Sequence, residues 1–138
     1  MKKQPKNRKF LKPHNPKKTT TSQKLQIKGS FRLQSLEAKM VPFEQLEEAR
    51  RSIIRSLGKK RNLIFHVFPS HPQTKFPNEV RMGGRKRSVN KWVFPLKKRS
   101  IVFELRNVKE LDAKKAFKKA NFKLNFKNKF IIITAKKI

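Results

Sequence analysis

The sequence predicts an α+β fold, in which two helices pack on a mixed, mainly antiparallel β-sheet behind a basic, extended N-terminal tail. Apolar residues alternate with polar ones in several short segments and recur every three or four positions in two longer segments, in the order strands, helix, strands, helix, strand. The first 24 residues contain nine Lys or Arg, three Pro and no acidic residue. Such a segment cannot bury enough apolar surface to fold alone. We therefore expect a basic extension over residues 1–24 and a single domain over residues 25–138.

The first half of the domain changes from the period of a strand to that of a helix. Strands with one buried face, bent at Gly29, are predicted by the alternation of Leu25, Ile27, Phe31, Leu33 and Leu36. A helix is predicted by an apolar stripe formed by Phe43, Leu46, Ala49, Ile53, Ile54 and Leu57. Pro42 and Gly58 flank this stripe, and these residue types are typical of helix starts and ends. Its acidic residues precede its basic ones, which complements the helix dipole and allows Glu47 to pair with Arg51.

The second half predicts further strands and a second helix. Residues 62–68 are rich in β-branched and aromatic residues and indicate a central strand that ends before Pro69. Residues 69–88 form a long connection with three prolines. Two strands, over residues 89–96 and 100–105, should flank a turn at Lys97, Lys98 and Arg99, and a last buried strand should span residues 130–135. A second amphipathic helix is predicted by Val108, Leu111, Ala116, Phe117, Ala120 and Leu124. Trp92 and most phenylalanines are expected in the core.

The charge of the chain points to a polyanionic partner. Among 138 residues there are 38 Lys or Arg and 8 Asp or Glu, a formal net charge of +30. Binding to phosphates converts this self-repulsion into affinity, so nucleic acid is the first hypothesis and an anionic membrane the second. No apolar run approaches the roughly 20 residues of a membrane span, which argues against a membrane protein.

Catalytic and metal sites find little support in the sequence. The chain has no cysteine, which excludes disulfides, thiolate ligands and thiol nucleophiles. The carboxylates cluster where helices should begin, and Glu104 is expected as a partly buried partner of a strand cation. His66 and His71 lack the further ligands that a metal needs, and Gly83-Gly84 is too short a signal for a nucleotide-binding loop. We expect no enzyme activity, no cofactor and no metal.

Residues 81–88 form the sharpest candidate for a binding site, with four cations and two glycines in eight residues. Arginine can fork two hydrogen bonds to a phosphate or stack on an unpaired base, and glycine allows close backbone approach. The alternative is a flexible, solvated hairpin tip. Because the aromatic residues fall mostly at core positions, recognition should rest on phosphate and shape contacts. The candidate RNA-binding residues are Lys6, Arg8, Lys9, Lys12, His14, Arg50, Arg51, Arg55, Arg85, Lys86 and Arg87. The tail could equally be a solvated segment or an import signal.

One run of residues is similar to the central signature of a known family: Val67-Phe68-Pro69, Pro72, Thr74, Pro77, Val80-Arg81-Met82-Gly83 and Trp92-Val93. With further matches in the tail and both helices, nearly the whole chain resembles the bacterial large-subunit ribosomal protein sixteen family. The resemblance implies an α/β-hammerhead-like fold, binding to large-subunit rRNA, and a role in late subunit assembly and in organising the tRNA-binding region. It also implies a tRNA-proximal loop formed by Arg81, Met82, Gly83 and Gly84, and hydroxylation of the residue matching Arg81 in some bacteria. The chain departs from the family at Arg85 and Arg87, where glycines are usual, and at Gly84, where lysine is usual.

The resemblance implies rRNA, tRNA and neighbouring ribosomal proteins as partners, and no homo-oligomer. The tail is similar to the family's own N-terminus, so we expect no cleavable presequence. Abundant Lys, Asn, Phe and Ile suggest an A/T-rich genome and favour a ribosome of the mitochondrial matrix, with the bacterial cytoplasm or a plastid as alternatives. The competing interpretations are a free-standing architectural or regulatory nucleic-acid-binding protein, a membrane-active cationic protein and, last, an enzyme.

Overall fold

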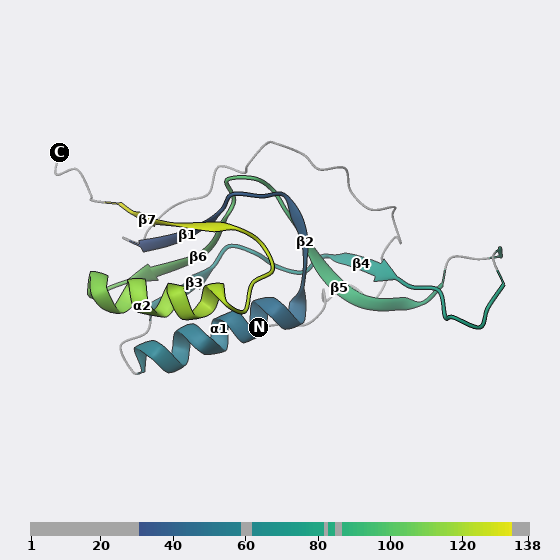
Figure 1. Ribbon diagram of the computed structural model, residues 1–138, viewed down its shortest axis with the longest axis horizontal. Coiled ribbons are helices and arrows are strands. Elements are labelled where there is room, and N and C mark those ends of the chain that lie inside the picture. The colour runs from purple at the N-terminus through teal and green to yellow at the C-terminus, as the bar shows by residue number, and fades with distance from the viewer. Residues whose placement is uncertain (1–30, 59–61, 82, 85–86, 134–138) are drawn as a thin grey trace.

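The strands of this protein form two antiparallel sheets, and the helices α1 and α2 lie together beneath the larger one (Figure 1). The computed structural model describes residues 31–58, 62–81, 83–84 and 87–133. In chain order the elements are β1 (Phe31–Ser35), β2 (Lys39–Pro42), α1 (Phe43–Leu57), β3 (Asn62–Phe65), β4 (His71–Thr74), β5 (Val89–Leu96), β6 (Ile101–Arg106), α2 (Glu110–Asn121) and β7 (Asn128–Ile132). The strand orders are β3-β6-β1-β7 and β2-β5-β4.

The core lies between the helices and the four-stranded sheet. Leu33 of β1 and Phe103 and Leu105 of β6 are buried there with Leu46, Ala49 and Ile53 of α1 and Ala113, Ala116, Phe117 and Ala120 of α2. The alanines allow the two helices to approach each other closely. An aromatic contact joins the layers, with the ring centroids of Phe117 and Phe130 5.7 Å apart. Within the sheet, the rings of Phe65 and Phe103 on neighbouring strands meet edge to face at 5.2 Å.

The first helix begins and ends where its sequence predicts. Pro42 precedes it in an extended conformation, with φ −70° and ψ 153°. At the other end Gly58 has φ 59° and ψ −132°, and its N–H donates to the carbonyl of Ile54 at 3.0 Å. Residues with a side chain rarely adopt this backbone conformation, so glycine is required at this position. The stripe with Leu46, Ala49 and Ile53 faces the core, as expected.

The fold class is confirmed, but several element assignments were wrong. Every described strand pair is antiparallel, and the strands form two sheets instead of one mixed sheet. The run at residues 62–68 forms the short edge strand β3, which ends at Phe65, while β1 and β6 occupy the centre. Strand β4 lies inside the expected loop 69–88, with Pro72 opposite Trp92. Its proline is tolerated because β4 is an edge strand of its sheet.

Three further expectations are corrected by exposure and strand limits. Leu36, directly after β1, and Leu111 of α2 were expected on buried faces. Both are exposed, Leu111 to 71%, so neither belongs to the core. The final strand, β7, covers Asn128–Ile132 at a sheet edge and is only partly buried. The second helix is shorter than predicted, although Val108 and Leu124 still pack on the core from its flanks. Trp92 is buried, with 7% of its surface exposed, as predicted. The tail, the expected strand before residue 31 and residues 134–135 lie outside the described residues.

Candidate RNA-binding surface

The two helices enclose a cationic hollow on their outer side. Its volume is about 470 Å³. It is lined by Arg51 and Arg55 of α1, by Lys119 of α2 and Lys123 just after that helix, and by Glu48 with two serines. The helices run in opposite directions in Figure 1, which brings the C-terminal end of α2 against the middle of α1. Four cations thus face one carboxylate at this surface, an arrangement suited to a phosphate-bearing ligand.

Glu47 organises the arginines of α1. The Nε atom of Arg50 donates to both carboxylate oxygens of Glu47, at 3.1 and 3.0 Å, and Arg51 Nε lies 3.5 Å from Oε1. The hydrogen bond from Arg50 lowers the pKa of Glu47, and the same bond raises the pKa of Arg50. The expected pair of Glu47 with Arg51 is therefore present, but Arg50 forms the closer contact. Arg51, with a side chain 63% exposed, is left to face solvent in the hollow.

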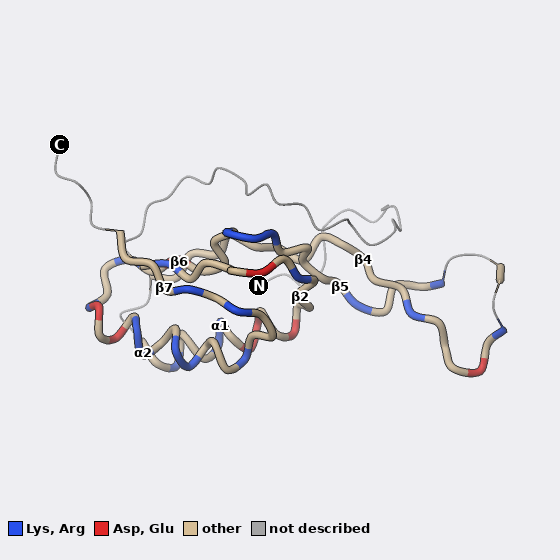
Figure 2. Tube along the Cα trace, turned by 45° about the horizontal axis from the view of Figure 1, so that its top comes forward, with Lys and Arg blue, Asp and Glu red and all other residues tan. Residues whose placement is uncertain are grey.

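The second cationic surface is an arm formed by β4, β5 and the loop between them, which projects away from the helices (Figure 2). Gly83 and Gly84 have φ values of 112° and 79°, so this part of the loop uses the backbone freedom that the sequence predicts. Arg81 is exposed. The guanidinium of Arg87 lies over the ring of Phe76, 5.5 Å from its centroid, and joins the two sides of the loop. Met82, Arg85 and Lys86 lie outside the described residues.

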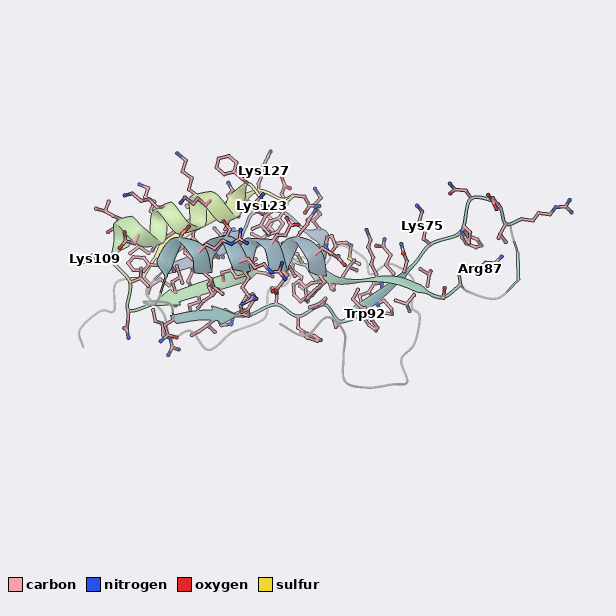
Figure 3. The ribbon with its side chains drawn as sticks, turned by 90° about the horizontal axis from the view of Figure 1, so that it is seen from below. Lys75, Arg87, Trp92, Lys109, Lys123 and Lys127 are labelled. Atoms are coloured by element: carbon pink, nitrogen blue, oxygen red, sulfur yellow. The ribbon has the colours of Figure 1, made fainter. Side chains whose placement is uncertain are left out.

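The structure does not gather the candidate residues into one site. Figure 3 shows Lys75 and Arg87 on the arm, far from Lys123 beside the helices. The tail candidates Lys6, Arg8, Lys9, Lys12 and His14 are outside the part of the chain that the structure describes. Two cations of the hollow, Lys119 and Lys123, were missed by sequence reasoning. The signal was available, because lysines at positions 115, 119 and 123 recur every four residues on the outer face of the predicted helix.

Two expectations about aromatic and charged side chains need correction. Phe122, directly after α2, is 79% exposed, and Phe76 and Phe68 are also exposed, so these phenylalanines are not in the core. Glu104 is completely buried, not partly so, and its Oε2 lies 2.5 Å from Nε2 of His66. A strand cation is present but farther away, with Arg106 Nε at 3.9 Å from Oε1. Burial lowers the pKa of the neighbouring Arg32, and the charge of Glu104 partly offsets this effect.

Within residues 31–58, 62–81, 83–84 and 87–133, no three His, Asp or Glu side chains come together as a metal site. Neither helix in these ranges is long and apolar enough to cross a membrane.

Comparison with known proteins gives a consistent result over almost the entire chain. The family described as ribosomal protein L16p/L10e matches residues 2–131. Large ribosomal subunit protein uL16 of Mycoplasmopsis synoviae is 39% identical over 132 residues, 93% of this chain and 94% of the relative. Protein uL16c of Rhodomonas salina is 38% identical over 129 residues, covering 92% and 94%, and uL16 of Rhodospirillum rubrum is 43% identical over 103 residues, covering 75% of each. This chain belongs to the ribosomal protein L16p/L10e family.

Proposed function

We propose that this chain is a structural constituent of the large ribosomal subunit that binds rRNA through the α1–α2 hollow and through the β4–β5 arm. Its family membership makes it a ribosomal protein and not an enzyme, with rRNA and other ribosomal proteins as partners. The observation that carries the assignment of surfaces is the segregation of charge. Cations gather on the outer side of the helices and along the arm, while the face between sheet and helices is apolar.

The hollow is suited to the phosphates of a folded RNA. Arg51, Arg55, Lys119 and Lys123 come from two helices that a shared apolar core fixes relative to each other. Cations held in place lose less conformational freedom on binding than cations on a mobile segment. We therefore assign the main rRNA contact to this surface, with Arg50 at its edge. The tail cations Lys6, Arg8, Lys9 and Lys12, together with His14, are proposed as further phosphate contacts.

The arm is proposed to reach a second RNA, tRNA, near the site where the ribosome handles it. Arg81, Gly83 and Gly84 lie in the loop between β4 and β5, which is the end of the arm that projects from the domain. Met82, Arg85, Lys86 and Arg87 belong to the same stretch of sequence. The glycines allow the backbone to lie close to an RNA surface, and the arginines can bind phosphates. Arg81 is exposed, as a site of side-chain hydroxylation would have to be.

Sedimentation of the native protein through a sucrose gradient tests the assignment to the large subunit. We expect the chain to sediment with large subunits and to stay with them in high salt, because folded RNA that contacts several surfaces of the chain holds it even when each phosphate contact is weakened. Recovery as free protein, on DNA or on anionic vesicles would instead support the free-standing or membrane-active alternatives. Replacing Lys86 and Arg87 by Ala tests the arm separately: tRNA binding by subunits that carry the variant should fall, while incorporation into subunits is kept.

We also propose that the ribosome in question is mitochondrial. The support is compositional. Abundant Lys, Asn, Phe and Ile with few Gly and Ala suggest an A/T-rich genome, and the strongly basic composition fits a mitochondrion-encoded ribosomal protein. The relatives reported above come from bacteria and from Rhodomonas salina, so they leave the compartment open. Fractionation of the source cells, followed by immunodetection on gradient-purified ribosomes from each compartment, would decide the question. Detection on cytoplasmic or plastid ribosomes alone would refute the mitochondrial assignment.

A further inference from the structure

A small pocket at the junction of the two sheets is not used by the function proposed above. It lies where the connection from β3 to β4 passes the turn between β5 and β6, and its volume is about 180 Å³. Phe94, Pro95 and Ile101 form its apolar wall. Pockets for drug-sized ligands begin at about 300 Å³, so this one suits a single small ring.

Polar groups line the rest of the pocket, and His66 is the most fixed of them. Its side chain is 10% exposed, its Nε2 contacts the buried carboxylate of Glu104 at 2.5 Å, and its backbone N–H donates to the carbonyl of Val102. An ionised carboxylate only accepts hydrogen bonds, so Nε2 is the donor in this pair. The other ring nitrogen, Nδ1, can form a hydrogen bond with a ligand. Ser70 and Ser100 add hydroxyl groups at the same pocket.

The turn between β5 and β6 places three consecutive cations, Lys97, Lys98 and Arg99, beside this pocket. Lys97 lines the pocket itself, whereas Lys98 and Arg99 are exposed. Arg99 has a φ of 64°, at a turn position that favours glycine. The turn is tied to β1, because the Arg99 N–H donates to Ser35 O at 2.9 Å and Gln34 Nε2 donates to Arg99 O at 2.8 Å. A strained, well-anchored turn that keeps an arginine where glycine is favoured is typical of a functional site.

We propose that this pocket receives one unpaired base of the bound RNA, with its ring against Phe94 and its flanking phosphates at the turn of Lys97, Lys98 and Arg99. Unpaired bases are recognised by stacking on aromatic side chains and by hydrogen bonds to their edges. A nucleotide accounts for all three features together: the small apolar wall, the fixed polar groups of His66 and the serines, and the adjacent cations. The inference rests on the proposed function, since it requires RNA to lie against this chain.

Ultraviolet crosslinking of isolated large subunits that carry the full chain tests this proposal. Short-wavelength light joins contacting bases and side chains directly, and mass spectrometry of the digested subunits identifies the peptide and nucleotide. We expect a nucleotide on the peptide containing Phe94. Ser70→Leu should fill the pocket from an exposed position, and Lys97→Ala should remove its cation. Ser70→Leu should reduce the crosslink by about fivefold or more, the lower end of the contribution of a stacked base. Lys97→Ala should also reduce it, because a phosphate contact is lost. The matched control is Lys109→Ala, which removes the same charge from an exposed position outside both the pocket and its turn, and it should leave the yield unchanged.

Crosslinks at the α1–α2 hollow show whether each variant is folded and incorporated. If crosslinks form at the hollow but none forms at Phe94, the base-binding proposal is overturned and the proposed function stands. If neither forms, both fail. An excess of nucleoside monophosphates distinguishes the source of the base: the crosslink should persist, because an rRNA nucleotide is held by the whole interface. Displacement by free mononucleotides, or a crosslink from this pocket to another protein, would also refute the proposal.

Discussion

Replacing both Arg51 and Arg55 by Gln should weaken RNA binding. It should also make the affinity less dependent on salt concentration. Both side chains are exposed and line the α1–α2 hollow. Arg51 also pairs with Glu47 at 3.5 Å, but an exposed pair of this kind contributes less than about 1 kcal/mol, so the fold should be kept. Each phosphate contact contributes about 0.9 to the slope of log K against log salt concentration. Two lost contacts should therefore reduce the slope by about 1.8.

This change in slope is large enough to measure. Raising the salt from about 50 to about 200 mM is a fourfold change, over which a slope difference of 1.8 corresponds to roughly a tenfold difference in affinity loss. The assay is fluorescence anisotropy of a labelled large-subunit rRNA fragment, titrated with the full chain at several salt concentrations. The variant should lose about tenfold less affinity across this range than the parent does.

The matched control removes the same charge elsewhere on the helices. Lys109→Gln combined with Lys114→Gln changes two exposed residues at the start of α2, away from the hollow (Figure 3 labels Lys109). We expect a smaller change in slope for this control. If the arginine variant kept the parent's slope, or if the control reduced the slope equally, the hollow would not be a specific phosphate site. The binding would then reflect only the overall positive field of the chain.

Three further predictions concern stability. Glu104→Gln should lower the free energy of unfolding by about 3–5 kcal/mol, because it leaves the buried Arg32 and the partly exposed Arg106 without their carboxylate. Urea denaturation followed by circular dichroism measures this change, and a loss under about 1 kcal/mol would contradict the prediction. The hydrogen bond from Arg50 depresses the pKa of Glu47 in the folded state. The pair therefore stabilises the fold fully at pH values above the pKa of the unfolded state, and this stabilisation is lost as the pH falls through the pKa of the folded state. Melting temperatures should accordingly drop more between neutral and acidic pH in the parent than in Glu47→Gln, and equal drops would refute the linkage. Gly58→Ala should destabilise by about 1–3 kcal/mol through backbone strain alone, since no atom lies within 4 Å of the added Cβ; an unchanged urea midpoint would show that the helix end relaxes.

Features set by local sequence were predicted well. The limits of α1, the glycine at its end and the strand β5 all follow from periodicity and backbone preference. Burial of Trp92 follows in the same way from its phase in that strand. Each of these properties depends on residues within a few positions of one another. Local reasoning was therefore enough to obtain the fold class.

Features set by long-range pairing were not predictable in this way. Strand β4 contains His71 and Pro72, neither of which favours a strand, and it forms because β5 offers a partner edge. The position of β3 at an edge depends on its pairing with β6. The sequence of residues 62–68 carries no information about that pairing. The same reason explains the partner of Glu104: His66 is 38 residues away in the chain, and only the strand register brings them together.

The candidate site shows the same division between local and long-range information. The positive φ values of the loop glycines agree with the interpretation of the sequence. Arg51 and Arg55 lie in the hollow, and their binding to RNA stays a prediction. The hollow itself required knowledge of how α1 aligns with α2, since Lys119 and Lys123 complete it from a helix about 65 residues later. Arg50 differs from Arg51 because it donates hydrogen bonds to both carboxylate oxygens of Glu47, whereas Arg51 lies farther away at 3.5 Å. Only side-chain geometry distinguishes one arginine of the helix from the next.

The distribution of acidic residues explains why the fold and its RNA are linked. Glu104 neutralises charge inside the protein, Glu47 engages two arginines and Glu37 lies 3.8 Å from Lys127. With only 8 acidic residues against 38 basic ones, most cations have no carboxylate to pair with. Their mutual repulsion therefore opposes the compact state, and phosphates bound at the hollow and the arm would remove that repulsion. A ligand that binds only the folded chain stabilises it, so RNA binding at these surfaces should also stabilise the fold that creates them.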